Sequence, residues 1–139
     1  MKALYLETSA IARAYLHLDV DDHATLQSAI QEADEVFTSA LTDVELRRAA
    51  TQLAHREGKR AELLVAALEC IRDADIIPLT DKVLARAGGA FPLPIRTLDA
   101  LHVATALEVQ LRPEITALVM LSRDKRVREV ATAVGLQLV

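Results

Sequence analysis

The sequence predicts an α/β fold, a parallel sheet with helices on both of its faces. Three observations lead to this fold class. Short apolar runs alternate with longer segments of helical periodicity along the whole chain. Residues 117–121 are almost entirely apolar, as expected of a strand that is covered on both faces. Finally, 139 residues with 52% hydrophobic side chains suit one domain, residues 1–139, with a sizeable core.

The expected strands are five short apolar runs, at residues 3–6, 36–39, 76–79, 117–121 and 136–139. Pro78 has no backbone N–H to give to a neighbour, so the third strand suits an edge of the sheet. No repeat, low-complexity segment or interdomain linker interrupts the pattern.

The expected helices lie between these runs, at residues 10–16, 22–33, 42–56, 59–72, 81–87, 98–111 and 123–134. Local signals set their ends. Thr42 and Glu45 match a capping box, in which the two side chains satisfy free backbone amides in the first turn. Thr80 is expected to cap the fifth helix, and Gly58 and Gly88 are expected to end the helices that precede them.

Composition excludes several classes of protein. Aromatic residues make up 3% of the chain and Trp is absent, so a surface that stacks nucleobases is not expected. No apolar stretch approaches the roughly 20 residues that span a bilayer. Glu7 ends the first apolar run too soon for a signal peptide, which favours the cytoplasm. The single Cys70 cannot form an internal disulfide and is expected to pack on a helix face.

Four carboxylates occupy equivalent places in the expected fold. Glu7 follows the first strand, and Glu45 lies in the helix after the second. Asp99 opens the sixth helix, and Asp124 follows the fourth strand. Ligands of open parallel sheets bind beyond the carboxyl ends of the strands, where all four acids are expected. Taken singly, the last three have ordinary explanations as caps or as partners of a helix dipole. Glu7 is harder to explain, because a carboxylate that ends a buried strand needs a cation or hydrogen-bond partners.

Grouped carboxylates repel one another, and a divalent cation relieves that repulsion. Oxygen ligands without a Cys or His cluster favour Mg²⁺ or Mn²⁺ over Zn²⁺. Such ions activate water and neutralise the charge that develops on a phosphate during hydrolysis. The net charge of −4 does not oppose phosphate binding, because 16 basic residues face 20 acids and setting aside the four candidates leaves 16 against 16. Basic clusters flank the acids, each typical by itself of a solvated helix face, at residues 47–48, 55–56, 59–60 and 123–128.

Four segments resemble the signature segments of PIN-domain ribonucleases, and in particular of VapC-type toxins from toxin–antitoxin pairs. They are residues 5–10 (YLETSA), 39–49 (SALTDVELRRA), 96–106 (RTLDALHVATA) and 121–124 (LSRD). The third segment is the most specific of the four, and the resemblance covers essentially the whole chain. It implies a three-layer α/β/α fold with a five-stranded parallel sheet in the order 3-2-1-4-5.

The resemblance also implies an activity and partners. It implies an endoribonuclease that hydrolyses RNA phosphodiesters, with structured RNA such as tRNA as the substrate and Mg²⁺ or Mn²⁺ as the cofactor. A cognate antitoxin would neutralise the toxin, which would form a homodimer or a toxin–antitoxin hetero-oligomer. The family's metal-binding acids fall on Glu7, Glu45, Asp99 and Asp124. Its two small hydroxyl residues fall on Ser9 and Ser122, where they could hold a ligand or water.

Glu7 is a departure from the family, which usually has Asp at that position. The extra methylene moves the carboxylate by about an ångström, and metal sites do not always tolerate such a shift. A protein that keeps the fold and the partner surface but cuts poorly is therefore an alternative reading. His102 lies three residues after Asp99. We interpret it as a hydrogen-bonded packing residue and not as a general base, because metal-bound water needs no imidazole.

Two further classes of small doubly wound protein fit less well. A signalling receiver domain needs a phosphate-accepting Asp after its third strand, but Asp81 is better explained as a first-turn helix residue and no fitting Lys is present. A phosphatase of the haloacid dehalogenase type needs a second Asp two residues after the first acid, where this chain has Ser9.

Overall fold

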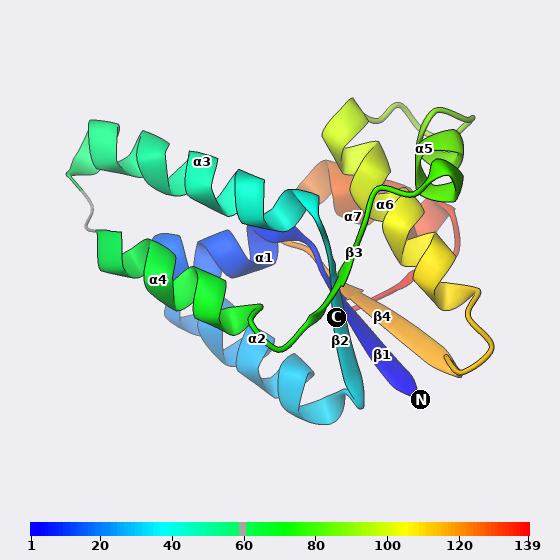
Figure 1. The fold of residues 1–139 in the computed structure, drawn as a ribbon, viewed down its shortest axis with the longest axis horizontal. Helices are drawn as coiled ribbons and strands as arrows, with labels where there is room; N and C mark the ends of the chain where they lie inside the picture. The colour runs from blue at the N-terminus through cyan, green and yellow to red at the C-terminus, as the bar shows by residue number, and fades with distance from the viewer. Residues whose placement is uncertain (59–60) are drawn as a thin grey trace.

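The computed structural model describes residues 1–58 and 61–139. Within them, the strands form one parallel sheet in the order β3-β2-β1-β4-β5, which confirms the expected fold class and strand order (Figure 1). The strands are β1 (Lys2–Leu6), β2 (Glu35–Ser39), β3 (Asp75–Ile77), β4 (Ala117–Leu121) and β5 (Gln137–Leu138). β1 is the central strand, so its carboxyl end lies between those of β2 and β4.

Helices connect the strands and cover both faces of the sheet. They are α1 (Thr8–Ile11), the π-helix η1 (Ala12–Leu16), α2 (Val20–Glu32), α3 (Leu41–Glu57), α4 (Ala61–Cys70), α5 (Asp81–Ala87), α6 (Thr97–Gln110) and α7 (Lys125–Ala133). In Figure 1, α3 and α4 lie side by side as a hairpin, and α5, α6 and α7 gather on the opposite side of the sheet.

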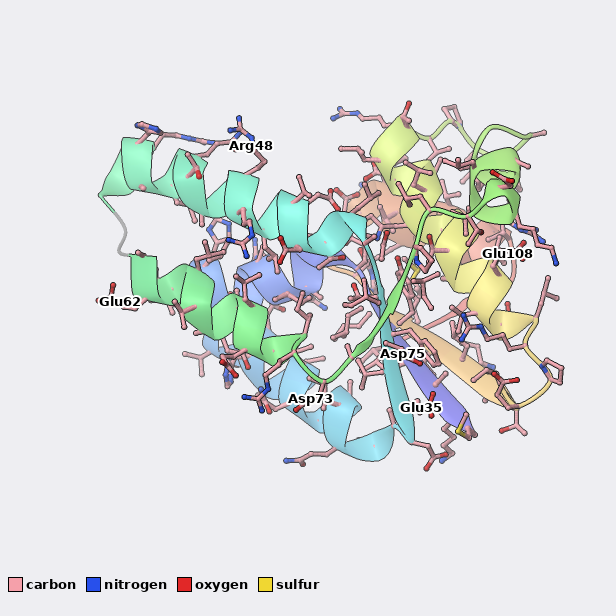
Figure 2. The ribbon with its side chains drawn as sticks, in the orientation of Figure 1. Glu35, Arg48, Glu62, Asp73, Asp75 and Glu108 are labelled. Atoms are coloured by element: carbon pink, nitrogen blue, oxygen red, sulfur yellow. The ribbon has the colours of Figure 1, made fainter. Side chains whose placement is uncertain are left out.

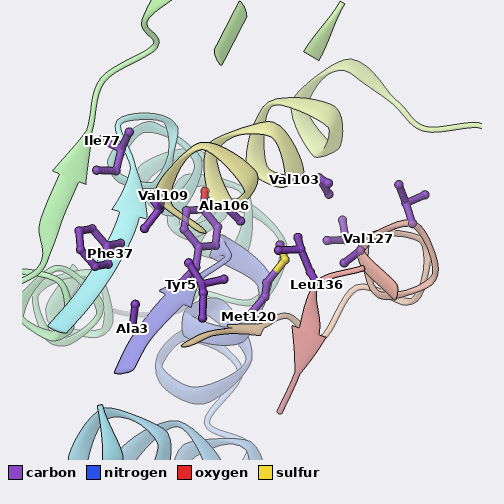
Figure 3. Close-up of a cluster of buried hydrophobic side chains, with 13 residues drawn as sticks. Ala3, Tyr5, Phe37, Ile77, Val103, Ala106, Val109, Met120, Val127 and Leu136 are labelled. Atoms are coloured by element: carbon purple, nitrogen blue, oxygen red, sulfur yellow. The ribbon is translucent and has the colours of Figure 1, made fainter. Parts of the chain in front are cut away.

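The alternation of side chains along β1 builds two cores, one on each face. Tyr5 points toward α6 (Figure 3) and belongs to the same buried cluster as Met120 and Val103. Leu4 and Leu6 point to the other face and pack against side chains of α1, α2, α3 and α4. Because both faces of β1 are covered, nearly every residue of the strand is apolar and buried.

The hairpin of α3 and α4 projects from the sheet. Gly58 ends α3 as expected, with a φ of 64° that a residue with a side chain rarely adopts. Lys59, at which we expected the next helix to begin, lies outside the described residues together with Arg60; the description of α4 starts at Ala61. Charged side chains such as Arg48 on α3 and Glu62 on α4 are exposed on this hairpin (Figure 2).

Cys70 ends α4 and is half-buried, packed against the core on the α2 side of the sheet. Burial raises the pKa of its thiol to about 11, although a hydrogen bond to Tyr15 acts in the opposite direction. The thiol is therefore protonated at neutral pH, which suits the packing role predicted for it.

The capping box predicted at Thr42 and Glu45 is wrong. Helix α3 begins one residue earlier, at Leu41, and the backbone N–H of that residue donates to Ser39 Oγ at 3.1 Å. Thr42 is fully buried and bonds to Thr38 Oγ1 at 2.8 Å, and the Glu45 carboxylate is bound by other partners. Both side chains form hydrogen bonds within the protein and do not bind the backbone amides of the first turn.

Other helix ends differ from the predictions for identifiable reasons. The expected helix at residues 10–16 is a short α-helix that runs into a π-helix, and it begins at Thr8 because Glu7 accepts the Ser9 N–H. The expected helix at residues 123–134 begins at Lys125, because Asp124 caps it by accepting the Val127 N–H at 3.0 Å. Thr80 caps α5 as predicted. None of the described helices is both long and apolar enough to cross a membrane.

Leu26 tests how firmly α2 is held on the sheet. Its side chain is fully buried, so Leu26→Ala is expected to lower the free energy of unfolding by about 2–5 kcal/mol. Val20 begins the same helix with 80% of its surface exposed, and Val20→Ala is expected to change stability by about 0.5 kcal/mol or less. Urea denaturation of the two variants makes the comparison. Equal effects would mean that α2 is not packed as described.

Candidate functional site

The candidate site lies at the carboxyl ends of β1 and β4. Leu6 pairs with Leu121 in the register of the two strands, and the Glu7 N–H donates to the Leu121 carbonyl at 3.0 Å. Glu7 and Ser122 therefore leave the sheet side by side. The connection from β1 turns to one face of the sheet and that from β4 to the other, which is the point where open α/β sheets bind ligands.

Glu7 is buried, with 4% of its surface exposed, and its carboxylate is held by hydrogen bonds. Oε2 accepts from the Ser9 backbone N–H at 3.1 Å, from the Ser122 hydroxyl at 2.8 Å and from the Ser9 hydroxyl over a short contact. These donors offset the loss of hydration that a buried carboxylate suffers.

The two serines also accept hydrogen bonds from the turn that follows β4. Ser9 Oγ accepts the Arg123 N–H at 2.8 Å, and Ser122 Oγ accepts the Asp124 N–H at 3.1 Å. Each serine hydroxyl thus donates a hydrogen bond to Glu7 and accepts one from a backbone N–H of the β4–α7 turn. The pair fixes the position of Asp124 relative to Glu7.

Glu45 reaches the same edge from α3. Its Oε1 accepts the Thr8 hydroxyl at 2.8 Å and lies 2.5 Å from His102 Nε2. An ionised carboxylate has no proton to give, so Nε2 must be the donor and Nδ1 is then the acceptor in the neutral ring. The acceptor lies 2.8 Å from the Tyr5 hydroxyl, which supplies that proton.

Burial and charge act on the Tyr5–His102 pair together. Burial and the nearby carboxylate of Glu7 raise the pKa of Tyr5 well above 10, so its hydroxyl remains a donor. For His102, burial lowers the pKa, but the hydrogen bond to Glu45 and the charges of Glu7, Glu45 and Asp99 outweigh it and leave the pKa raised. The imidazole thus lies in the field of three acids although it is fully buried.

Asp99 lies in the first turn of α6. Burial raises its pKa above the ordinary 3.8, the charges of Asp124, Glu7 and Glu45 raise it as well, and the charge of His102 lowers it. Charges influence one another's ionisation mainly when they lie close together inside a protein. The four acids singled out in the sequence therefore share one electrostatic environment; their chemical roles stay predictions.

A family model for the PIN domain matches residues 4–133. The chain belongs to the PIN-domain family. Two curated PIN-domain relatives from Mycobacterium tuberculosis match nearly full length. One is named ribonuclease VapC35, 33% identical over 98% of this chain and 95% of the relative, and places the chain in the VapC group of the family. The other, named ribonuclease VapC46, is 31% identical over 100% of this chain and 98% of the relative.

A solved structure shows the same PIN fold. The structure of VapBC2 from Rickettsia felis, bound to a DNA fragment from its promoter, aligns with a TM-score of 0.67. The alignment covers 99% of this chain and 97% of that one at 14% sequence identity, so the likeness is one of fold.

The donor set of this PIN domain fits a hard divalent cation in its chemistry. Burial and the charges of three carboxylates raise the pKa of the fourth, Asp99, and positive charge between the four would act in the opposite direction. As they stand, however, no group of three or more Asp, Glu, His or Cys side chains in residues 1–58 and 61–139 is arranged to hold a metal ion. Hydrogen bonds explain this arrangement, because Glu7, Glu45 and Asp124 each already bind serine, threonine, histidine or backbone donors.

The sequence did not reveal two parts of the site. Thr8 links Glu45 to His102, with its hydroxyl 3.3 Å from His102 Nε2, although its place in the sequence indicated no such role. His102 is a hydrogen-bonded buried residue as predicted, but its ring contacts Glu45 directly. A polar residue directly after Glu7 and a histidine within an apolar helix were the only available signals.

The repulsion at Asp99 leads to a prediction about stability. Protonation of Asp99 favours the folded state, so the stabilisation is complete below the ordinary pKa of 3.8 and is lost as the pH rises through the raised pKa. Asp99→Asn keeps the side chain neutral at every pH. Since solvent screens this partly exposed group, we expect the variant to raise Tm by about 1–3 °C at pH 7 in EDTA.

Two comparisons make this measurement specific. Below pH 3.8 the advantage of Asp99→Asn over the unmodified chain should shrink, because protonation of Asp99, whose pKa is raised above that value, removes its charge as well. Asp81 is a first-turn acid of α5 that is not among the charges that raise the pKa of Asp99, and Asp81→Asn should not raise Tm. A lower Tm for Asp99→Asn at pH 7 would contradict the account of repulsion.

Proposed function

We propose that this VapC-type PIN protein is a toxin of a toxin–antitoxin pair and acts as a Mg²⁺- or Mn²⁺-dependent endoribonuclease. The observation that carries the proposal is the geometry at the carboxyl ends of β1 and β4, where Ser122 donates to Glu7 at 2.8 Å and accepts the Asp124 N–H at 3.1 Å. The raised pKa of Asp99, which burial and the charges of Asp124, Glu7 and Glu45 cause, supports it. A divalent cation would relieve the repulsion among these acids, and a cation bound in this way can promote the hydrolysis of phosphodiesters. The names of two relatives, ribonucleases VapC35 and VapC46, support RNA as the substrate class.

In this proposal, Glu7, Glu45, Asp99 and Asp124 hold the metal. When bound, the metal would supply a nucleophilic water at neutral pH and would neutralise charge that develops on the phosphate. The other residues of the site position these acids. Ser9 and Ser122 orient Glu7, and Thr8 with His102 orients Glu45.

Tyr5 acts one step further from the acids. Its hydroxyl donates to His102 Nδ1 and so fixes which nitrogen of the ring faces Glu45. This buried chain of hydrogen bonds keeps Glu45 in place through contacts that do not involve the substrate.

The partners follow from the same comparison. The solved neighbour from Rickettsia felis is a structure of VapBC2, which supports a cognate antitoxin as the partner of this chain. We propose that this antitoxin covers the acidic edge. From the likeness to the VapC group we further propose a homodimer of the toxin and a structured RNA such as tRNA as the substrate.

Cleavage of a structured RNA pool by purified, antitoxin-free protein tests the activity. We expect cutting with Mg²⁺ or Mn²⁺, no cutting with EDTA, and a loss of at least about a hundredfold in Asp99→Asn. The loss is expected because, in this proposal, Asp99 is one of the four acids that hold the metal, and the charges of the other three contribute to its raised pKa. Asp81→Asn, which changes a first-turn acid on α5, should cut normally. Cutting that persists in EDTA would contradict the proposed mechanism.

A second candidate function is a PIN protein that binds its partners and cuts poorly. The observation that favours it is the tight hold of Ser9 and Ser122 on Glu7, whose side chain is one methylene longer than the aspartate usual in the family. It predicts that a folded, unmodified chain cuts weakly and that Glu7→Asp raises the rate by up to about a hundredfold. A Glu7→Asp variant that cuts no faster than the unmodified chain would contradict this candidate.

A further inference from the structure

A basic groove lies next to the acidic site, and the mechanism above does not use it. Arg123, Lys125 and Arg128 line an open cavity of about 820 Å³, together with Glu129, a threonine and two leucines. Three cations against one acid give this lining a charge of +2, in a chain whose net charge is −4. The groove is therefore positively charged although the net charge of the whole chain is negative.

The groove is joined to the site through the β4–α7 turn. Arg123 stands between Ser122 and Asp124, and its backbone N–H donates to Ser9 Oγ at 2.8 Å. Arg128 donates to the Ser122 carbonyl at 2.9 Å. An RNA strand with one phosphate at the four acids would therefore place a neighbouring phosphate close to Arg123 and Arg128.

Arg123 is held in position by a buried acid. Its Nε lies 2.8 Å from Asp22 Oδ1, and only 6% of the Asp22 side chain is exposed. The Arg123 side chain itself is 39% exposed, and it has no other ion-pair partner in the part of the chain that the structure describes. Asp22 fixes one edge of the guanidinium, so its terminal nitrogens remain able to donate to an anion.

The place of these cations on α7 is not explained by the stability of the helix. Lys125 is the first residue of α7, and the first turn contains no acid. The dipole of a helix favours acids at this end and disfavours cations. Positive charge here opposes folding slightly and becomes favourable when an anion is bound.

We propose that the groove lined by Arg123, Lys125 and Arg128 binds backbone phosphates of the RNA strand on one side of the cleavage point. The inference rests on the proposed ribonuclease function and adds the path of the substrate. Phosphates are the expected contacts because the groove offers cations and apolar side chains but no aromatic ring on which a base could stack.

Binding of a fluorescein-labelled oligouridylate to the full chain in EDTA tests the groove without cleavage. Lys125→Gln is expected to weaken binding about three- to tenfold and to make the slope of log Kd against log salt shallower by about 0.7 to 1. Arg128→Gln should act in the same direction. Thermal melts of both variants establish that the chain is folded. Lys125 is exposed, so Lys125→Gln still tests the groove if Arg128→Gln destabilises the chain.

Arg126 provides the matched control. It lies on the same helix and next to Lys125, but its guanidinium donates to the Pro94 carbonyl at 3.1 Å and does not line the groove. Arg126→Gln removes the same charge and should leave binding unchanged. Equal losses in Arg126→Gln and Lys125→Gln would show an effect of net charge alone and would overturn the proposal, as would no loss in Lys125→Gln or no RNA binding by the unmodified chain.

Two outcomes separate this inference from the proposed function. RNA cutting that depends on Asp99, with equal binding by Lys125→Gln and Arg126→Gln, would overturn the groove and keep the ribonuclease. Selective loss of binding in Lys125→Gln, without any cutting by the unmodified chain, would keep the groove and overturn the ribonuclease. A competition with polyglutamate adds a third arm: loss of polyglutamate binding in Lys125→Gln, with RNA binding intact, would assign the groove to an acidic polypeptide and overturn the proposal.

Discussion

Repulsion among the carboxylates at the end of β1 is the constraint on which the rest of this structure depends. Glu7 is almost fully buried, so the fold must supply partners for its charge. It supplies two serines and a backbone amide for Glu7, a threonine and a histidine for Glu45, and the first turn of α7 for Asp124. Burial and the charges of Asp124, Glu7 and Glu45 raise the pKa of Asp99, so the remaining cost of ionisation falls on this carboxylate.

These hydrogen bonds also join segments that lie far apart in the sequence. Ser9 and Ser122 connect the turn after β1 to the turn after β4. Thr8 connects the turn after β1 to α3 and α6, through Glu45 and His102. The site is thus assembled from both neighbours of the central strand. Replacing Glu7 or Glu45 would therefore remove hydrogen bonds between segments that lie far apart in the sequence.

Much of the fold follows from the sequence, because the signals involved are local and repeated. Apolar runs located each strand of the sheet, and Thr80 and Gly58 marked helix ends through chemistry that needs no distant partner. The capping box at Thr42 failed for the opposite reason. Its hydroxyl bonds to Thr38 and its glutamate to His102, 57 residues away, and a local pattern cannot reveal a competitor at that distance.

The site shows the same limit. The place of each acid after its strand was sufficient to group the four, since all parallel strands end at one edge. The orientation of Glu7 onto two serines was not predictable, because it depends on a turn in which Arg123 and Asp124 donate their amides to those serines. The π-helix after α1 had no signal either, since its residues are ordinary helix formers.

The distribution of charge connects the site to its proposed substrate. A net charge of −4 argues against phosphate binding only when charge is averaged over the whole molecule. Charges are screened over about 8–10 Å at physiological ionic strength, so a phosphate responds to the groups close to it. Next to the acidic edge, the α7 turn presents Arg123, Lys125 and Arg128. Asp124 and the three basic side chains thus lie within a few residues of one another, which suits a metal cation at the point of hydrolysis and phosphates beside it.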